Sequence, residues 1–181
     1  MKNMFLTALA VVFTISASNA QTFTLRSKAI GGQATTQEVF NGFGCTGDNI
    51  SPELFWENAP KEAKSFAVTM YDPNAPTGSG FWHWVVFDIP ANITELKSNA
   101  GNIAKALAPQ GAIQSNTDFG KPGYGGPCPP EGHGFHEYII TVYALKIDKL
   151  GLNEAVNPAM VGFYLFQNTI AKASLVMYYK R

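Results

Sequence analysis

The stretch Ser-Phe-Ala-Val-Thr-Met-Tyr-Asp at residues 65–72 says more about the fold than any other part of the chain. It is rich in the aromatic and β-branched residues that favour strands. Alternate side chains from Phe66 through Met70 to Asp72 fall on one face, which is the period of a strand with one buried face. Pro73 follows directly and stops the pattern. We therefore expect a core strand that ends on a carboxylate.

Two more segments have the same character. Residues 81–89 follow a short loop of Pro and Gly, and residues 136–145 begin directly after the long Gly/Pro-rich segment 109–134. A shorter alternating run covers residues 23–27. An irregular segment as long as 109–134 inside a compact domain is usually functional. We therefore expect it to contribute to a site.

The end of the chain has a different pattern. Residues 157–172 have helix-compatible spacing, and Pro158 suits a first helical turn. Residues 174–179 fit either a helix or a final strand. Because the strands alternate with irregular segments and not with regular helices, a largely antiparallel sheet is favoured over a doubly wound parallel one. The predicted fold class is mainly β with some α. No repeat or linker divides residues 21–181, so a single domain is expected.

The composition limits the class of protein. The chain has 13 Lys and Arg against 13 Asp and Glu, which gives a formal net charge of zero, and no basic run is present. Nucleic-acid binding therefore has no electrostatic support. Seventeen Gly, 11 Pro and an aromatic content of 13% favour strands and tight turns over a helical bundle. No cofactor is predicted.

The first twenty residues predict export. Lys2 precedes an apolar stretch at residues 5–15, and small and polar residues then lead to Ala20. This is the pattern of a secretory signal peptide, here residues 1–20. The apolar stretch is short for a membrane-spanning helix, so no stable membrane span is expected after cleavage. An uncleaved anchor or a buried helix is the alternative. The predicted location is periplasmic or secreted.

The chain has two cysteines, Cys45 and Cys128. In an oxidising compartment an isolated pair is most simply a disulfide. Two buried free thiols are the alternative, because cysteine also packs as a small hydrophobic residue. The predicted compartment favours the disulfide.

Three polar residues lie at or near the ends of the predicted strands, namely Asp72, His83 and His136. If the strands are antiparallel neighbours, these ends meet on one rim of the sheet. His136 and Tyr138 share a face of their strand. A carboxylate beside an imidazole fixes the tautomer of the ring and raises its proton affinity. We expect an anion pocket whose affinity falls as the pH rises through the histidine range near ~6.5.

Two kinds of neighbour would complete such a pocket. Glycines allow backbone N–H groups to approach an anion closely, and aromatic side chains supply apolar walls. The candidate glycines are Gly125, Gly126, Gly132 and Gly134, and the candidate aromatics are Phe81, Trp82, Trp84, Tyr124 and Tyr138. Each of these residues also has an ordinary structural explanation in a turn or a core. His133 is expected to be a surface residue.

Five runs of residues, in order along the chain, resemble the phosphatidylethanolamine-binding proteins, in the bacterial branch called Raf-kinase-inhibitor-like. They are Cys-Thr-Gly-Asp-Asn-Ile-Ser-Pro-Glu-Leu-Phe-Trp at 45–56, Asp-Pro-Asn-Ala-Pro at 72–76, His-Trp-Val-Val at 83–86, the segment 116–130 centred on Gly-Tyr-Gly-Gly-Pro-Cys-Pro-Pro, and His-Glu-Tyr at 136–138 with Val-Tyr-Ala-Leu at 142–145. The resemblance covers about residues 23–181. It implies a large central antiparallel sheet, a second smaller sheet, a C-terminal helix and a pocket for phosphate, phosphorylethanolamine or similar anions.

The resemblance also implies which residues bind the ligand. Those that match the family pattern are Asp72, Pro76, His83, Pro129, Pro130, His136 and Tyr138. The family often has a second acid where this chain has Asn74. Because that carboxylate is a candidate for gripping an ammonium group, its absence implies a preference for plain anions over a zwitterionic ethanolamine head.

Three functions compete. The first is a binding or regulatory protein for a small anionic ligand or phospholipid head group, with any protein partner unknown. The second is a hydrolase with histidine as acid and base and Asp72 orienting it. It lacks a G-x-S-x-G elbow, and a disulfide-bonded Cys128 cannot attack. The third is a zinc site at Asp72, His83 and His136, whose spacing is not a recognised ligand pattern. Binding is favoured, with no catalytic residue and no metal assigned.

Overall fold

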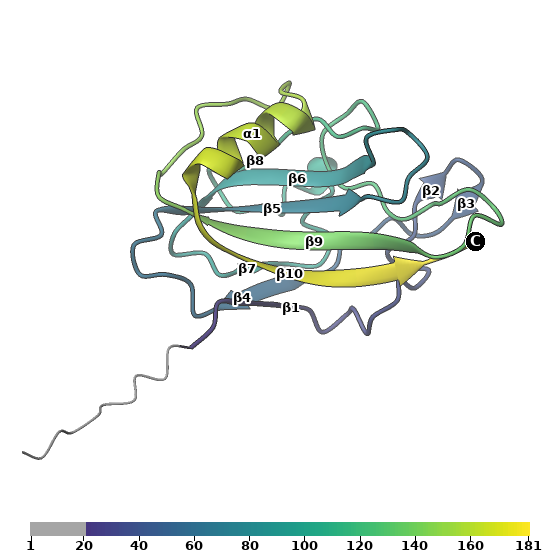
Figure 1. The fold of residues 1–181 in the computed structure, drawn as a ribbon, viewed down its shortest axis with the longest axis horizontal. Coiled ribbons are helices and arrows are strands. Elements are labelled where there is room, and N and C mark those ends of the chain that lie inside the picture. The colour runs from purple at the N-terminus through teal and green to yellow at the C-terminus, as the bar shows by residue number, and fades with distance from the viewer. Residues whose placement is uncertain (1–20) are drawn as a thin grey trace, which may run out of the picture.

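The computed structural model describes residues 21–181, and the predicted signal peptide at residues 1–20 lies outside the described residues. Figure 1 shows the arrangement. The elements in chain order are β1 (Thr24–Arg26), β2 (Asn41–Gly42), β3 (Cys45–Thr46), β4 (Leu54–Glu57), β5 (Ser65–Asp72), β6 (Phe81–Pro90), β7 (Glu95–Leu96), the 3-10 helix η1 (Ile103–Lys105), β8 (Ile113–Gln114), β9 (His136–Leu145), α1 (Pro158–Asn168) and β10 (Thr169–Tyr179).

A five-stranded antiparallel sheet forms the centre of the fold, in the order β10-β9-β5-β6-β8. A second sheet has the order β1-β4-β7, and β2 pairs with β3. The three strands expected to form the core are β5, β6 and β9, and they are direct neighbours. The predicted fold class is confirmed: the structure is mainly β, with a large antiparallel sheet, a smaller sheet and one helix near the C-terminus.

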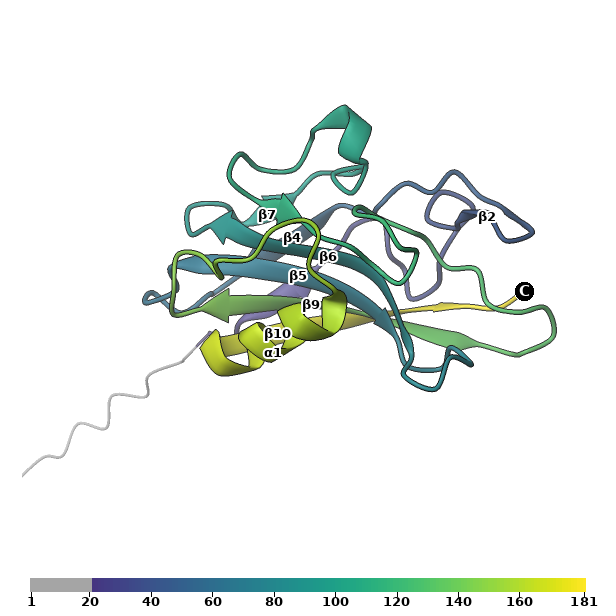
Figure 2. The same cartoon turned by 90° about the horizontal axis from the view of Figure 1, so that it is seen from above.

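The large sheet buries both of its faces. One face packs against the small sheet in a core that includes Val68 and Met70 from β5 and Trp56 from β4. The other face is covered by α1, whose Val161 and Leu165 are buried. Figure 2 shows α1 on one side of the sheet and β4 and β7 on the other. Because both faces are covered, seven of the eight residues of β5 are buried.

The predicted helix over residues 157–172 is too long. The Asn157 side chain caps α1 by accepting a hydrogen bond from the backbone N–H of Met160 at 2.9 Å, and Pro158 occupies the first turn as expected. The helix ends at Asn168, because the next residues pair with β9 as the start of β10. Strand pairing therefore overrides local helix propensity there. In the described part of the chain, no helix has the length and apolar character needed to cross a membrane.

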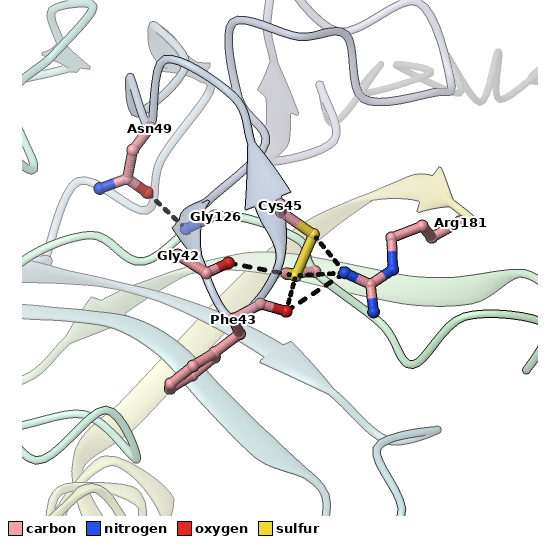
Figure 3. The surroundings of a disulfide bond; sticks show 7 residues. Gly42, Phe43, Cys45, Asn49, Gly126 and Arg181 are labelled. Atoms are coloured by element: carbon pink, nitrogen blue, oxygen red, sulfur yellow. Dashed lines mark hydrogen bonds between the residues drawn. A yellow bond between two sulfur atoms is a disulfide. The ribbon is translucent and has the colours of Figure 1, made fainter.

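The segment 109–134 is held by a disulfide. The segment was expected to be irregular, and it is, except for the two-residue strand β8. Cys128 is bonded to Cys45 of β3, with 6.0 Å between their Cα atoms, so the predicted disulfide is confirmed. The guanidinium of Arg181 lies beside this bond and donates to the carbonyl oxygen of Phe43 at 3.2 Å (Figure 3). The disulfide thus ties the Gly/Pro-rich segment to the β2–β3 region.

Candidate functional site

The ends of β5, β6 and β9 meet at one edge of the large sheet, because the strands are antiparallel neighbours. Asp72 ends β5 and pairs with Phe81 of β6, while Tyr71 pairs with Ile139 of β9. A cavity of about 220 Å³ lies at this edge. The seven residues predicted to bind a ligand all line it: Asp72, Pro76, His83, Pro129, Pro130, His136 and Tyr138. The other lining residues are Phe43, Ala75, Thr77, Phe81, Phe119 and Cys128.

Asp72 and His136 form a buried pair within this lining. Nδ1 of His136 lies 2.7 Å from Oδ2 of Asp72, and their side chains are only 1% and 3% exposed. Because an ionised carboxylate only accepts hydrogen bonds, the imidazole donates its Nδ1–H, which orients the ring. On the other side of the same ring, Nε2 lies 2.7 Å from Nδ1 of His133. A contact this short between two ring nitrogens has room for one proton, so one ring donates and the other accepts.

His133 is the polar residue of the site that the sequence reasoning missed. It is exposed, as predicted, but its ring contacts the buried histidine of the pair. The backbone N–H of His133 donates to the carbonyl oxygen of Pro130 at 3.2 Å, and this turn brings the ring back toward the strand that follows. The available signal was the spacing of two histidines three residues apart across a tight turn.

A β-bulge aims His83 at the cavity. Met70 pairs with Trp84 and Tyr71 pairs with Trp82, so His83 is the extra residue between them. A bulge turns a side chain away from the strict alternation of a strand, and bulges are common beside functional sites. This one lets His83 line the cavity while the neighbouring Trp84 still packs in the core. Simple alternation along the sequence cannot produce that arrangement.

The ring of His83 is held in its neutral form. Its Nδ1 lies 2.8 Å from the carbonyl oxygen of Gly125, and the side chain is buried. Burial lowers the pKa of His83 to about 4, and the backbone carbonyls of Gly125 and Gly126 and the charges of Asp72 and Asp118 only partly oppose this. The expectation that the imidazoles lose their protons near pH 6.5 is therefore wrong for His83, because this ring is already neutral at that pH.

Tyr138 presents a hydroxyl without a partner. The side chain lines the cavity, is fully buried, and has no hydrogen-bond partner for its oxygen among the described residues. Burial, followed by the nearby charge of Asp72, raises the pKa of Tyr138 well above its usual range, and the nearby backbone N–H of Cys128, which is outside hydrogen-bond geometry, only partly opposes this. The hydroxyl therefore keeps its proton and can donate it to a hydrogen-bond acceptor in the cavity.

Three of the four candidate glycines do not provide free N–H groups for an anion. Gly125 donates to the carbonyl oxygen of His83, Gly126 to the Asn49 side chain, and Gly132 to the carbonyl oxygen of Arg181. A Cβ on Gly126 would overlap the carbonyl oxygen of Glu38, so this glycine is needed for close packing. The N–H groups of these three glycines are thus used to fold the loop (Figure 3 shows the Asn49–Gly126 bond).

The apolar walls also differ from those expected. Of the five candidate aromatics, Phe81 and Tyr138 line the cavity, whereas Trp84 and Tyr124 belong to the core between the sheets and Trp82 packs on the helix side. Their places are taken by Phe43 and Phe119. These rings come from loops, where no periodic pattern indicates which way a side chain points.

Comparison with known proteins identifies the family. The sequence model described as phosphatidylethanolamine-binding protein matches residues 27–180. The chain belongs to the phosphatidylethanolamine-binding protein family. Among its relatives, the UPF0098 protein YbcL of Escherichia coli K12 is 45% identical over 99% of each chain. The UPF0098 protein YbhB of the same organism is 50% identical over 77% of this chain and 87% of its own length.

Solved structures of phosphatidylethanolamine-binding protein relatives share the fold. The crystal structure of Escherichia coli YbcL, described as a new member of the mammalian family, matches with a TM-score of 0.86 and 47% identity, covering 88% of this chain and 98% of that chain. The homologue CT736 from Chlamydia trachomatis matches with a TM-score of 0.73 and 28% identity, covering 91% and 99%. The resemblance noted in the sequence is therefore confirmed.

Asn74 stands where the resemblance noted in the sequence implies a second acid. Its side-chain oxygen accepts the backbone N–H of Glu137 at 2.9 Å, and its own backbone N–H donates to Asp72 at 2.8 Å. The residue is exposed and does not line the cavity. Asn74 therefore joins the end of β5 to the start of β9 and leaves Asp72 as the one carboxylate in the lining.

The lining has little positive charge to offer. Within residues 21–181, neither Lys nor Arg is among the lining residues. Over the same residues, no group of three or more His, Cys, Asp and Glu side chains has a metal-binding arrangement. Among the lining residues, the polar side chains are therefore one carboxylate, two imidazoles, one phenol and the hydroxyl of Thr77, which donates to the carbonyl oxygen of Gly80.

Proposed function

We propose that this member of the phosphatidylethanolamine-binding protein family is an exported binding protein that takes a small anion, a phosphate or a lipid-head-group-like phosphoryl group. The observation that carries the proposal is the hydroxyl of Tyr138. A buried hydroxyl without a partner costs about 1–3 kcal/mol, and a ligand that accepts its proton removes this cost. A fold retains such a group at a cavity most readily where a ligand completes it.

The rest of the lining supports a small ligand. The Asp72–His136 pair is rigidly oriented, and Pro76, Pro129 and Pro130 add walls that lose little entropy when a ligand binds. A cavity of about 220 Å³ suits a compact anion or head group better than a long chain. The ligand class is a small anion or a phospholipid head group.

Export is part of the same proposal. The signal pattern at residues 1–20 and the disulfide between Cys45 and Cys128 both favour an oxidising compartment, the periplasm or the medium. The mature protein is residues 21–181, which form one domain in this proposal.

A hydrolase in the same cavity is the weaker alternative. The oriented Asp72–His136 pair resembles an acid–base pair, but a nucleophile is also required. The sulfur of Cys128 is in the disulfide, and the hydroxyl of Thr77 donates to the carbonyl oxygen of Gly80. Neither lining residue is free to attack, so binding is favoured.

Replacing Tyr138 by phenylalanine tests the proposal. Y138F is expected to weaken the binding of inorganic phosphate about tenfold, since one hydrogen bond to a charged group contributes about 1.5–3 kcal/mol. The free energy of unfolding should stay equal or rise, because the lost hydroxyl has no hydrogen-bond partner within residues 21–181. Calorimetric titration and urea unfolding measure the two quantities.

Tyr143 provides the matched control. It lies on the same strand but packs on the helix side of the sheet, away from the cavity, so Y143F should leave phosphate affinity unchanged. Equal affinity in Y138F and the unchanged protein would contradict the role of the hydroxyl. Absence of phosphate binding in the unchanged protein would overturn the proposed function.

A further inference from the structure

The tautomer of His83 decides what its cavity side can do. The carbonyl oxygen of Gly125, 2.8 Å from Nδ1, only accepts hydrogen bonds, so Nδ1 must carry the proton. In a neutral ring the other nitrogen, Nε2, is then an acceptor with a free lone pair. Nε2 has no hydrogen-bond partner among the described residues, and the ring lines the cavity. His83 therefore offers a ligand an acceptor.

The surroundings oppose a second proton on this ring. Phe81, Phe119 and Tyr138 each place an aromatic ring about 5 Å from the imidazole, centre to centre. The charged groups that face His83 are Asp72 at the end of β5 and Asp118 in the segment before β9, and they do not outweigh the loss of water. Tyr138 of β9, whose ring contacts that of His83, stays neutral, and His136 of the same strand is paired with Asp72.

Tyr138 offers the complementary group. Its hydroxyl donates, and its ring lies 5.1 Å from that of His83, so both can contact one small ligand in a cavity of about 220 Å³. The pair therefore matches a group that has an acceptor oxygen and an O–H on the same centre. A fully ionised oxyanion has only acceptors, and one of its oxygens would meet the lone pair of His83.

We infer that the cavity selects phosphoryl groups that keep one acidic proton, and rejects oxyanions of the same shape and charge that have none. The P–OH donates to Nε2 of His83, while an ionised oxygen of the same group accepts from Tyr138. This inference rests on the proposed function and specifies its ligand. It also fits the charge of the lining. Within residues 21–181, the lining contains one carboxylate and neither Lys nor Arg. A second negative charge on the ligand would add to its repulsion from Asp72.

The inference separates two sources of a phosphoryl group. A phosphate monoester has a second pKa of about 6 and so keeps a proton in mildly acidic solution. The phosphate of an intact phospholipid is a diester, which has no P–OH once ionised. The favoured ligand is therefore a free monoester or inorganic phosphate, and an intact membrane lipid is disfavoured.

Three methyl esters of equal charge separate the effect of the acidic proton on binding from the effect of the charge. At about pH 5.5, methyl phosphate is mostly a monoanion with one P–OH, while dimethyl phosphate and methyl sulfate are monoanions with none. Calorimetric titration of the disulfide-intact protein should give an affinity for methyl phosphate about tenfold or more above that for the other two. These two have no proton to donate to Nε2 of His83, and a buried acceptor left without a donor lowers the affinity. The affinity for methyl phosphate should then fall as the pH rises above about 6.

Nitrogen NMR of His83 provides a readout that needs no variant. In the free protein its shifts should report a neutral ring protonated at Nδ1, and methyl phosphate should move the Nε2 signal toward the value of a hydrogen-bonded acceptor. In Y138F the three affinities should fall together, since the hydroxyl donates to an ionised oxygen that all three esters have.

The outcomes distinguish the two proposals. Methyl sulfate binding within about twofold of methyl phosphate would overturn the proton selectivity alone. A protonated Nε2 on His83 at neutral pH would do the same. If none of the three esters and no inorganic phosphate binds, the proposed function fails and the inference fails with it.

Discussion

Removing the disulfide by replacing Cys45 and Cys128 with alanine is expected to lower the free energy of unfolding by roughly 4 kcal/mol. The two residues are 83 positions apart, so the bond restricts a large part of the unfolded chain. The chain-entropy account gives a stabilisation of about 4.5 kcal/mol for a loop of this size, and measured values are often somewhat lower. This is a large share of the 5–15 kcal/mol that is usual for a domain.

The same change should weaken ligand binding. Cys128 lines the cavity directly, and Pro129 and Pro130 follow it, so the freed segment would lose part of its fixed wall. Arg181 rests against the sulfurs and would lose that contact (Figure 3). Urea unfolding and phosphate titration of the double variant measure both effects.

Reduction of the unchanged protein is the control for this prediction. It removes the bond without changing the residues, and its unfolding curve should match that of the double variant. A loss of less than about 1 kcal/mol in both would mean that the loop is held mainly by its other contacts, because that value lies below the usual range for a native disulfide.

Acidification from about pH 6.5 to about pH 4 is expected to destabilise the fold by roughly 3 kcal/mol through His83. The pKa of His83 is lowered in the folded protein to about 4 from an ordinary value of 6.5. Between these values the unfolded chain binds a proton that the folded ring does not, so the free energy of unfolding falls as the pH falls. Below the folded pKa both states are protonated and this contribution stops changing.

His83→Asn isolates the contribution. The asparagine amide can donate to the carbonyl oxygen of Gly125 in place of Nδ1–H but does not titrate. Other groups also titrate on acidification, so the measurement is the difference between the two proteins in urea unfolding at several pH values. As the pH falls from about 6.5 to 4, the free energy of unfolding should fall more in the unchanged protein than in the variant, because only the unchanged protein has the histidine. Parallel stability curves for the two proteins would show that the ring is not held neutral.

Much of the fold follows from local patterns. The alternation in β5, the breaker Pro73 and the apolar run of β6 predicted neighbouring strands, and their ends do meet at one edge of the sheet. The helix boundary was wrong because residues 169–172 pair with β9. Propensity describes a short stretch by itself, whereas that pairing depends on a strand more than twenty residues away.

Most residues of the candidate site could also be predicted from the sequence, whereas one contact could not. The sequence and the resemblance it shows identified Asp72, His83, His136 and Tyr138, and the structure brings all four to one cavity. The missed contact came from His133, whose turn brings it onto the buried ring.

By itself, the sequence determined the fold class, the family and the residue types at the cavity, because periodicity, breakers and motifs are properties of neighbouring residues. Tertiary structure alone decided that His83 is a neutral acceptor and that the N–H groups of Gly125 and Gly126 are already used. It also decided that the hydroxyl of Tyr138 has no partner among the described residues. Protonation and hydrogen-bond supply depend on burial and on partners far away in the chain, and those partners come together only when the chain folds.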